Sequence, residues 1–517
     1  MNRLFLSFFL LAAGLNSQAA QTEASLVPND SSFDSLAVQH RGRIKPFFSF
    51  AQEVTTTLTG RSSVQLPDLG KVNARQLILS LWMEPDGWNE EPIVLVEDPA
   101  LRKELGLTEH NRLFSLRRLS ALPRLSQLTA IAETARASGS RDSIPPVAAA
   151  AQNVSLRVNL LQSILSGDAL RMIPPPSGSP SGSPWSPTTG QIKSPSALAE
   201  IQSHTQIPQA KLSLEVIYLK FHPFRWAWIS WLFAALFLLS QKKEKASRSL
   251  SLGWFFSLLG SLLLVAGFAV RVWIAGRPPV TNMYESILWV AFGSSLFAIF
   301  FAARYRAPAY LLAASPVVIL ALVASDLQPA VLDPSLNPLV PVLRSNFWLT
   351  IHVLTITLSY GAFALATALG HFLVFRSLQS RTLPSADDAG VLQLYRCLQI
   401  GVLLLAAGVI LGGVWANYSW GRFWDWDPKE TWALIALLSY IILLHGRLGG
   451  WWGGYGLAVG SIACFLTILM AWYGVNFVLG KGLHSYGFGN GGQLYVGIFA
   501  FLELLLIIFA LARRPSS

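Results

Sequence analysis

The sequence predicts an all-α polytopic membrane protein with about nine transmembrane helices and an exported N-terminal domain of mixed or helical structure. Two observations on composition predict this class. Hydrophobic residues make up 52% of the 517 residues, and charged residues only 13%, about half the usual share in soluble proteins. The mean hydropathy is also positive, at +0.45. Soluble enzymes, disordered chains and fibrous repeats are therefore excluded.

The positive charge and the cysteines narrow the possible functions. A net charge of +11 would indicate nucleic acid only if Lys and Arg clustered on one surface. In the second half they lie mostly between apolar runs, where they act as topology signals, so no nucleic-acid partner is expected. Cys397 and Cys464 are too few and too isolated for a disulfide framework, a zinc site or a redox pair. No Cys-x-x-Cys-His occurs, so the chain is not itself a c-type cytochrome.

Residues 1–20 resemble a secretory signal peptide. A short basic start is followed by an apolar run, Leu4 to Leu15, and then by small residues up to Ala20. An uncleaved anchor is the alternative, although the run is short for spanning a bilayer. In either case the segment that follows should be exported.

Residues 21–173 have the composition of a soluble domain, which we expect to be exported. The stretches Arg43–Leu58 and Asn73–Trp82 have helical periodicity. Residues 174–220 begin with a run rich in Pro, Ser and Gly, which predicts a flexible linker and a lead-in to the membrane. No catalytic motif occurs in this region. Its lone histidines are interpreted as surface or hydrogen-bonded residues: His40, His110 and His204.

Residues 221–517 form the membrane domain. The nine predicted spans are residues 224–240, 250–270, 284–303, 308–325, 347–375, 397–416, 431–445, 453–475 and 493–512. The fifth is long and should tilt or project beyond the bilayer. With an exported N-terminus, the inner segments carry about twice as many Lys and Arg as the outer loops. This asymmetry predicts an N-out, C-in topology with an odd number of spans.

The outer loop after the sixth span, residues 415–432, contains five tryptophans together with Asp425, Asp427 and Glu430. Tryptophans can anchor a protein at the membrane interface. An anchor belt has no use for acidic residues between its rings, so we favour a broad apolar platform for a large flat aromatic ligand. The two aspartates could pair with Arg422 or Lys429, or orient a histidine.

The string WGRFWDWDPKETWAL resembles the tryptophan-rich "WWD" signature of haem-handling membrane proteins. Within that superfamily the chain is most similar to the CcsA (ResC) family, the membrane component of the System II cytochrome c synthase. Three further stretches match it in the family's order: Pro278–Ser286, Asn346–His352 and Gly482–Gly487. The resemblance covers residues 220 to 512. The N-terminal residues carry no such signature and are interpreted as an exported extension, of a kind seen on some larger or fused members.

His352 and His484 lie on the outer side and bracket the Trp-rich loop. Two imidazoles on opposite faces of a porphyrin would give bis-histidine ligation of the iron. The alternative is a pair of interfacial histidines that form hydrogen bonds. The resemblance implies the first, because the family's external axial ligands match these positions.

His445, at the inner end of the seventh span, resembles the family's transmembrane haem-binding histidine, whose partner belongs to a CcsB (ResB) subunit. His371 lies about 28 Å deeper than His352 on the same span and could replace that partner, or be an ordinary packing residue. His222 is interpreted as interfacial. The residues expected to bind haem b are therefore His352, His484, His445, Trp415, Trp420, Trp424, Trp426, Asp427 and Trp432.

The resemblance implies cytochrome c biogenesis. Haem would be moved or presented on the outer side of the membrane and attached through thioether bonds to an apocytochrome c. The acceptor's Cys-x-x-Cys-His supplies the thiols, so no catalytic residue of this chain is assigned; it would be a component of holocytochrome c synthase. The implied partners are a CcsB/ResB-like subunit, the apocytochrome and a thiol-reducing thioredoxin-like protein, at the bacterial inner membrane with the loop and N-terminal domain in the periplasm.

Two alternatives stay open. One is a haem exporter or chaperone without a synthase role, similar to the shorter CcmC proteins. The other is a cytochrome b-type redox subunit that holds haem permanently between helices. The latter needs paired histidines inside the bilayer, for which only His371 and His445 could serve.

Overall fold

The computed structural model describes residues 24–107, 111–137, 144–180, 182–188, 192–204, 207–240, 248–327, 331–338, 346–479 and 492–515. The chain divides into two compact units, one of residues 1–40 and 44–212, the other of residues 41–43 and 213–517. The predicted signal peptide lies outside the described residues.

The N-terminal unit combines short helices with three two-stranded sheets. Its strands are β1 (Ala37–His40), β2 (Arg43–Pro46), β3 (Ser63–Leu66), β4 (Gly70–Asn73), β5 (Pro92–Leu95) and β6 (Leu113–Ser115). Its helices are α1 (Phe47–Thr59), α2 (Ala74–Met83), α3 (Pro99–Glu104), α4 (Leu116–Ser120), α5 (Pro123–Ala137), α6 (Pro146–Leu165), α7 (Pro195–Ser203) and the short η1 (Ser31–Phe33). Both helices predicted from periodicity are present, but residues 43–46 form strand β2 instead of the first turn of α1.

The segment predicted to be a flexible linker has fixed contacts, which corrects that interpretation in part. Ile173 and Ser186 form an isolated antiparallel bridge. Trp185, only 6% exposed, packs against Ala37 and Leu212. The Pro- and Gly-rich composition cannot build a core of its own, and the segment is instead held by contacts with other residues of the unit, among them the packing of Trp185 and its backbone hydrogen bond to the Gln39 side chain.

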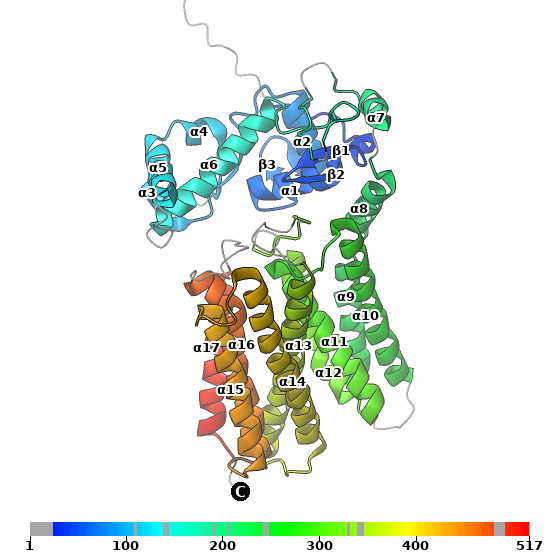
Figure 1. Ribbon diagram of the computed structural model, residues 1–517, viewed down its shortest axis with the longest axis vertical. Helices are drawn as coiled ribbons and strands as arrows, with labels where there is room; N and C mark the ends of the chain where they lie inside the picture. The colour runs from blue at the N-terminus through cyan, green and yellow to red at the C-terminus, as the bar shows by residue number, and fades with distance from the viewer. Residues whose placement is uncertain are drawn as a thin grey trace, which may run out of the picture. The chain divides into compact units, whose positions relative to one another are not determined.

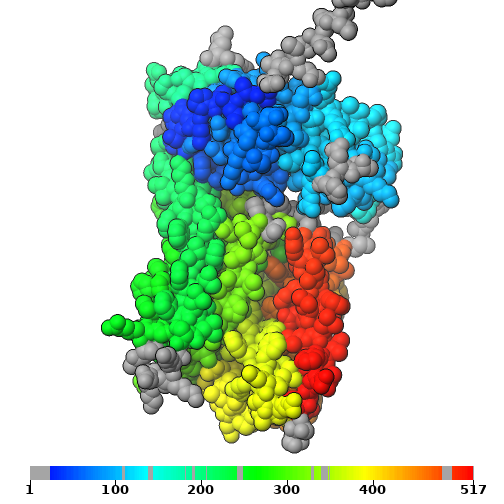
Figure 2. All heavy atoms as spheres, turned by 180° about the vertical axis from the view of Figure 1, so that it is seen from behind, coloured from blue at the N-terminus to red at the C-terminus, as the bar shows by residue number. Residues whose placement is uncertain are grey.

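The second unit is a bundle of long helices that run side by side (Figure 1). The helices are α8 (Gln209–Phe221), α9 (Pro223–Leu239), α10 (Arg248–Ala275), α11 (Met283–Tyr305), α12 (Ala309–Leu327), α13 (Asn346–Ser380), α14 (Ala389–Trp420), α15 (Pro428–Leu448), α16 (Gly454–Leu469), the π-helix η3 (Met470–Leu479) and α17 (Gln493–Ala512). Helix α17 (red) lies on the outside of this unit in Figure 2, and most of its apolar side chains are exposed.

Eight helices among the described residues are long and apolar enough to cross a membrane, which confirms a polytopic all-α membrane unit. Helix α9, the first predicted span, has 17 residues and is not one of these eight. The count of nine spans and the N-out orientation stay predictions. Helix α13 has 35 residues, about 52 Å at the α-helical rise, and so exceeds the roughly 30 Å apolar core of a bilayer as predicted.

Small residues let the central helices approach closely. A Cβ atom on Gly361 of α13 would lie 2.9 Å from the Cα of Gly293 in α11, and one on Gly408 of α14 would lie 2.8 Å from Ile356 Cβ in α13. The Ser294 hydroxyl also donates to the Gly361 carbonyl at 2.8 Å. These contacts fix α11 and α14 on either side of α13, where the candidate site lies.

Candidate functional site

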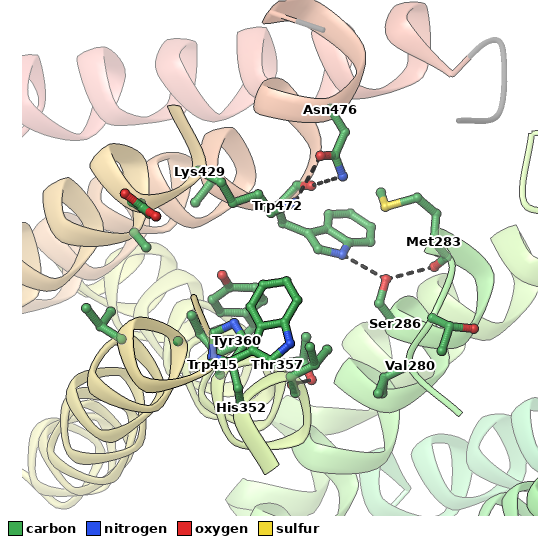
Figure 3. Close-up of a pocket in the computed structure, with 18 of the residues that line it drawn as sticks. Val280, Met283, Ser286, His352, Thr357, Tyr360, Trp415, Lys429, Trp472 and Asn476 are labelled. Atoms are coloured by element: carbon green, nitrogen blue, oxygen red, sulfur yellow. Dashed lines mark hydrogen bonds between the residues drawn. The ribbon is translucent and has the colours of Figure 1, made fainter. Parts of the chain in front are cut away.

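A cavity of about 1180 Å³, counting the open space at its mouth, lies between α11, α13, α14, α15 and η3 (Figure 3). Three of the sequence stretches singled out above contribute to the wall: residues 280–286, His352 on α13, and Trp415 to Glu430. The fourth stretch, which contains His484, lies outside the described residues.

His352 lies in this cavity with its ring orientation fixed. Its Nδ1 is 2.8 Å from the carbonyl oxygen of Gly408, and its ring stacks on that of Trp415 at 6.1 Å between centroids and 9° between planes. Because a carbonyl can only accept, Nδ1 carries the hydrogen and the neutral ring has its lone pair on Nε2. This is the tautomer that a metal ligand needs, oriented in the usual way by a backbone carbonyl.

The tryptophans are not equivalent. Trp415, 1% exposed, and Trp424 line the cavity. Trp420 packs behind Trp415, edge to face at 4.7 Å. Trp426 is 69% exposed and contacts Trp424 edge to face at 5.8 Å. Among the described residues, the cavity lining does not include Trp420, Trp426 or the half-buried Trp432.

The loop prediction for residues 415–432 is corrected at both ends. Helix α14 continues to Trp420, and α15 begins at Pro428, which leaves residues 421–427 as the connection. Gly421 ends α14 in the left-handed conformation, at φ 76°, which favours glycine. The connection is therefore shorter than the sequence pattern predicts.

The acidic residues of this connection hold its shape. Asp427 is the N-cap of α15 and forms a capping box with Glu430. One Glu430 oxygen accepts from Arg422 at 3.0 Å, and the other accepts from the backbone amides of Asp425 and Asp427. Arg422 also pairs with Asp425 at 3.4 Å. The predicted pairing of Asp425 with Arg422 is thus present, whereas Asp427 serves the helix terminus.

The opposite wall contains residues that the sequence reasoning missed, Trp472 and Asn476 of η3. The Trp472 indole donates to the Ser286 hydroxyl at 2.9 Å. The Lys429 ammonium donates to the Asn476 side-chain oxygen at 3.0 Å. A π-helix inside a membrane helix often marks a functional site, and here it directs both residues into the cavity. The available signal was a polar Asn directly after an apolar span.

The remaining histidines lie elsewhere. His445 is exposed on α15, and its Nδ1 lies 2.9 Å from the Ile441 carbonyl of its own helix. His371 is bonded at both ring nitrogens, to the Thr367 carbonyl at 2.8 Å and to Glu503 at 3.1 Å. His222 precedes α9, and burial lowers the pKa of its imidazole below the ordinary value.

Comparison with known proteins gives matches to both units. Residues 280–484 match the model of the family described as cytochrome C assembly protein. The cytochrome c biogenesis protein CcsA of Prochlorococcus marinus (strain NATL2A) is 37% identical over 268 residues, covering 45% of this chain and 84% of that protein. The CcsA protein of Synechococcus sp. (strain CC9902) is 36% identical over 259 residues, covering 44% of this chain and 84% of that protein.

A longer match extends beyond the membrane unit. Protein NrfI of Wolinella succinogenes is 30% identical over 514 residues, covering 89% of this chain and 54% of NrfI. The chain therefore spans about half the length of that relative. The unmatched 11% of the chain is shorter than the N-terminal unit, so the similarity reaches well into residues before 213.

Proposed function

The chain belongs to the CcsA family of cytochrome c biogenesis proteins, and we propose that its cavity binds haem b and presents it on the outer side of the membrane for thioether attachment to apocytochrome c. In this proposal haem is the cargo, held at the iron by His352 and His484. The cavity would face the periplasm of a bacterial inner membrane. His445 would bind haem before it reaches the cavity.

The observation that carries the proposal is the setting of His352. A histidine whose Nδ1 hydrogen is committed to Gly408 stands in an aromatic cavity, against Trp415 and near Trp424. A histidine with a purely structural role would not need an open cavity lined by aromatic side chains beside it. Apolar and aromatic walls with a few oriented polar groups fit a large flat ligand.

The residues of this chain bind, orient and shield the cargo. The new carbon–sulfur bonds form between the haem vinyl groups and the acceptor's two cysteines, so this chain needs no nucleophile. Cys397 and Cys464 do not line the cavity, in accord with that division of roles. Positioning of the reactants alone can lower a reaction barrier by several kcal/mol. The proposed partners are a CcsB/ResB-like subunit, an apocytochrome with Cys-x-x-Cys-His and a thioredoxin-like reductant.

An exporter or chaperone without synthase activity is the second candidate, because the same cavity serves either role. A cytochrome b-type subunit is less well supported. It would require His371 and His445 as a haem pair, and both ring nitrogens of His371 are already bonded to protein groups.

The test is to purify the full chain, record its haem spectrum and supply reduced apocytochrome c with the partner subunit. We expect a low-spin histidine-ligated spectrum and covalent product. His352→Ala should lose haem or change the spectrum, with recovery on added imidazole, whereas the exposed His204→Ala should be unaffected. Normal haem and normal product in His352→Ala would overturn the proposal, while haem that stays bound without product would favour the chaperone.

A further inference from the structure

We propose that Lys429, positioned by Asn476, binds a propionate carboxylate of the haem and so fixes the rotation of the porphyrin in its own plane. This inference rests on the proposed function, because it names a contact with the same cargo in the same cavity. It assigns to Lys429 a role in orientation that is separate from iron ligation.

The Lys429 ammonium is held at the cavity wall by a short chain of hydrogen bonds (Figure 3). It donates to the Asn476 side-chain oxygen at 3.0 Å, and the Asn476 amide nitrogen donates to the Trp472 carbonyl at 3.4 Å. The second bond determines which way the amide faces and so presents its oxygen to the lysine. Lys429 is therefore fixed in place by a neutral group.

The charges around the cavity leave this ammonium as a site for an anion. Among the described residues, the charged groups that line the cavity are Lys429 and Glu430. Both Glu430 oxygens are already used, by Arg422 and by two backbone amides. The nearby Asp427 carboxylate caps α15 and accepts the Lys429 backbone amide at 3.0 Å. Of these charged groups, the Lys429 ammonium is the one that can donate a hydrogen bond to a ligand in the cavity.

An ammonium has three donors, and the described structure gives Lys429 one hydrogen bond, to an uncharged acceptor. A partly buried cation is stabilised when an anion completes its hydrogen bonds. A ligand carboxylate would supply that anion without displacing Asn476.

The iron ligands and the aromatic walls leave one rotation of the haem unconstrained, the rotation of the porphyrin in its own plane. Axial histidines would fix the iron, and the apolar and aromatic walls of the cavity would limit the tilt of the porphyrin plane. Neither prevents rotation about the iron–nitrogen axis. A contact at the porphyrin edge removes that freedom, and the propionates are the edge groups that an ammonium recognises. The vinyl groups would then face one fixed direction, as addition of two ordered thiols requires.

The experiment measures the affinity of the full-length protein, in lipid nanodiscs, for haem and for haem dimethyl ester, in which both propionates are esterified. Wild type should bind haem about tenfold or more tightly than the ester, the range for a hydrogen bond to a charged group. In Lys429→Met this preference should fall close to one, whereas Lys429→Arg should retain most of it. Lys220→Met is the matched control, an exposed lysine that does not line the cavity.

Asn476→Asp is a second variant that keeps the lysine. Its new carboxylate would pair with Lys429, so the preference for haem over the ester should also fall. An unchanged ratio in both Lys429→Met and Asn476→Asp would overturn the inference, as would a wild-type ratio near one. If wild type binds neither haem nor the ester, the proposed function itself fails. The two failures are thus distinguishable, and the wild-type ratio decides the inference even if the variants fold poorly.

Discussion

In the candidate site, a few residues are packed so closely that one added methyl group would clash with a neighbouring side chain. Gly412 shows this best, because a Cβ atom there would lie 2.7 Å from Cε1 of the His352 ring. The ring cannot easily retreat, since it is bonded to Gly408 on one side and stacked on Trp415 on another. At the residue scale, therefore, glycine is as much a part of the proposed ligand site as the histidine.

Gly412→Ala should lower haem content or change the haem spectrum although His352 is still present. The added methyl group forces the imidazole to move by several tenths of an ångström or more and misdirects Nε2. Gly497→Ala is the control, because a Cβ there meets nothing within 4 Å. Both variants should be compared by absorption spectroscopy at equal protein concentration. Identical spectra for Gly412→Ala and wild type would mean that the His352 ring is not the ligand.

The tryptophans differ at the same scale. Trp424→Ala should weaken haem binding about fivefold, corresponding to roughly 1 kcal/mol of ring contact. Trp426→Ala should have a smaller effect, because Trp426 is largely exposed and acts on the cavity through Trp424. Haem titration of the two variants in parallel checks the order. A larger loss for Trp426→Ala would instead favour the platform centred on the exposed ring.

At the scale of elements, the connection between α14 and α15 is held in a defined conformation by side-chain contacts. Arg422, Asp425, Asp427 and Glu430 join its two ends through the contacts described above. The sequence pattern predicts the helices and the Trp-rich segment well, because apolar length and composition decide both. It does not reveal that Asp427 is a cap, since a cap and a ligand-orienting carboxylate have the same residue type.

The same limit explains why Trp472 and Asn476 were missed. Hydropathy identifies the span but carries no information on where an α-helix becomes a π-helix, and that change decides which side chains reach the cavity. Glycine contacts such as Gly293 with Gly361 are likewise decided by tertiary packing. The sequence therefore predicts the helices and the motif on one side of the site. The residues of the facing wall can be identified only from the folded structure.

Asp427→Ala should reduce thermal stability, by about 0.5–2 kcal/mol of unfolding free energy for a lost N-cap. Asp427→Asn should be close to wild type in stability, because asparagine caps a helix about as well. Haem content should follow stability in both variants. The measurement is thermal unfolding in detergent alongside haem absorbance. A stable Asp427→Asn protein without haem would show that the carboxylate charge acts on the ligand and not on the helix.

At the scale of the whole molecule, two separate histidine sites are proposed on the membrane unit. His352 lies in the cavity, and His445 lies near the other end of α15, which begins at the Trp-rich connection. The helical rise from Trp432 to His445 corresponds to about 20 Å. His445 is exposed on the surface of its helix, where a separate subunit could reach it. An ionisable residue on a membrane helix is a functional candidate by default.

In the proposed function, haem made in the cytoplasm would have to cross the bilayer, and its propionates make unassisted crossing unfavourable. If His445 binds haem on that route, His445→Ala should lose haem from the cavity as well, even though His352 and His484 are intact. Added imidazole should restore it, because the defect is a missing ligand. Ser439→Ala, on the same helix, is the control. Cavity haem at the wild-type level in His445→Ala would mean that haem arrives by another path and that His445 is a structural residue.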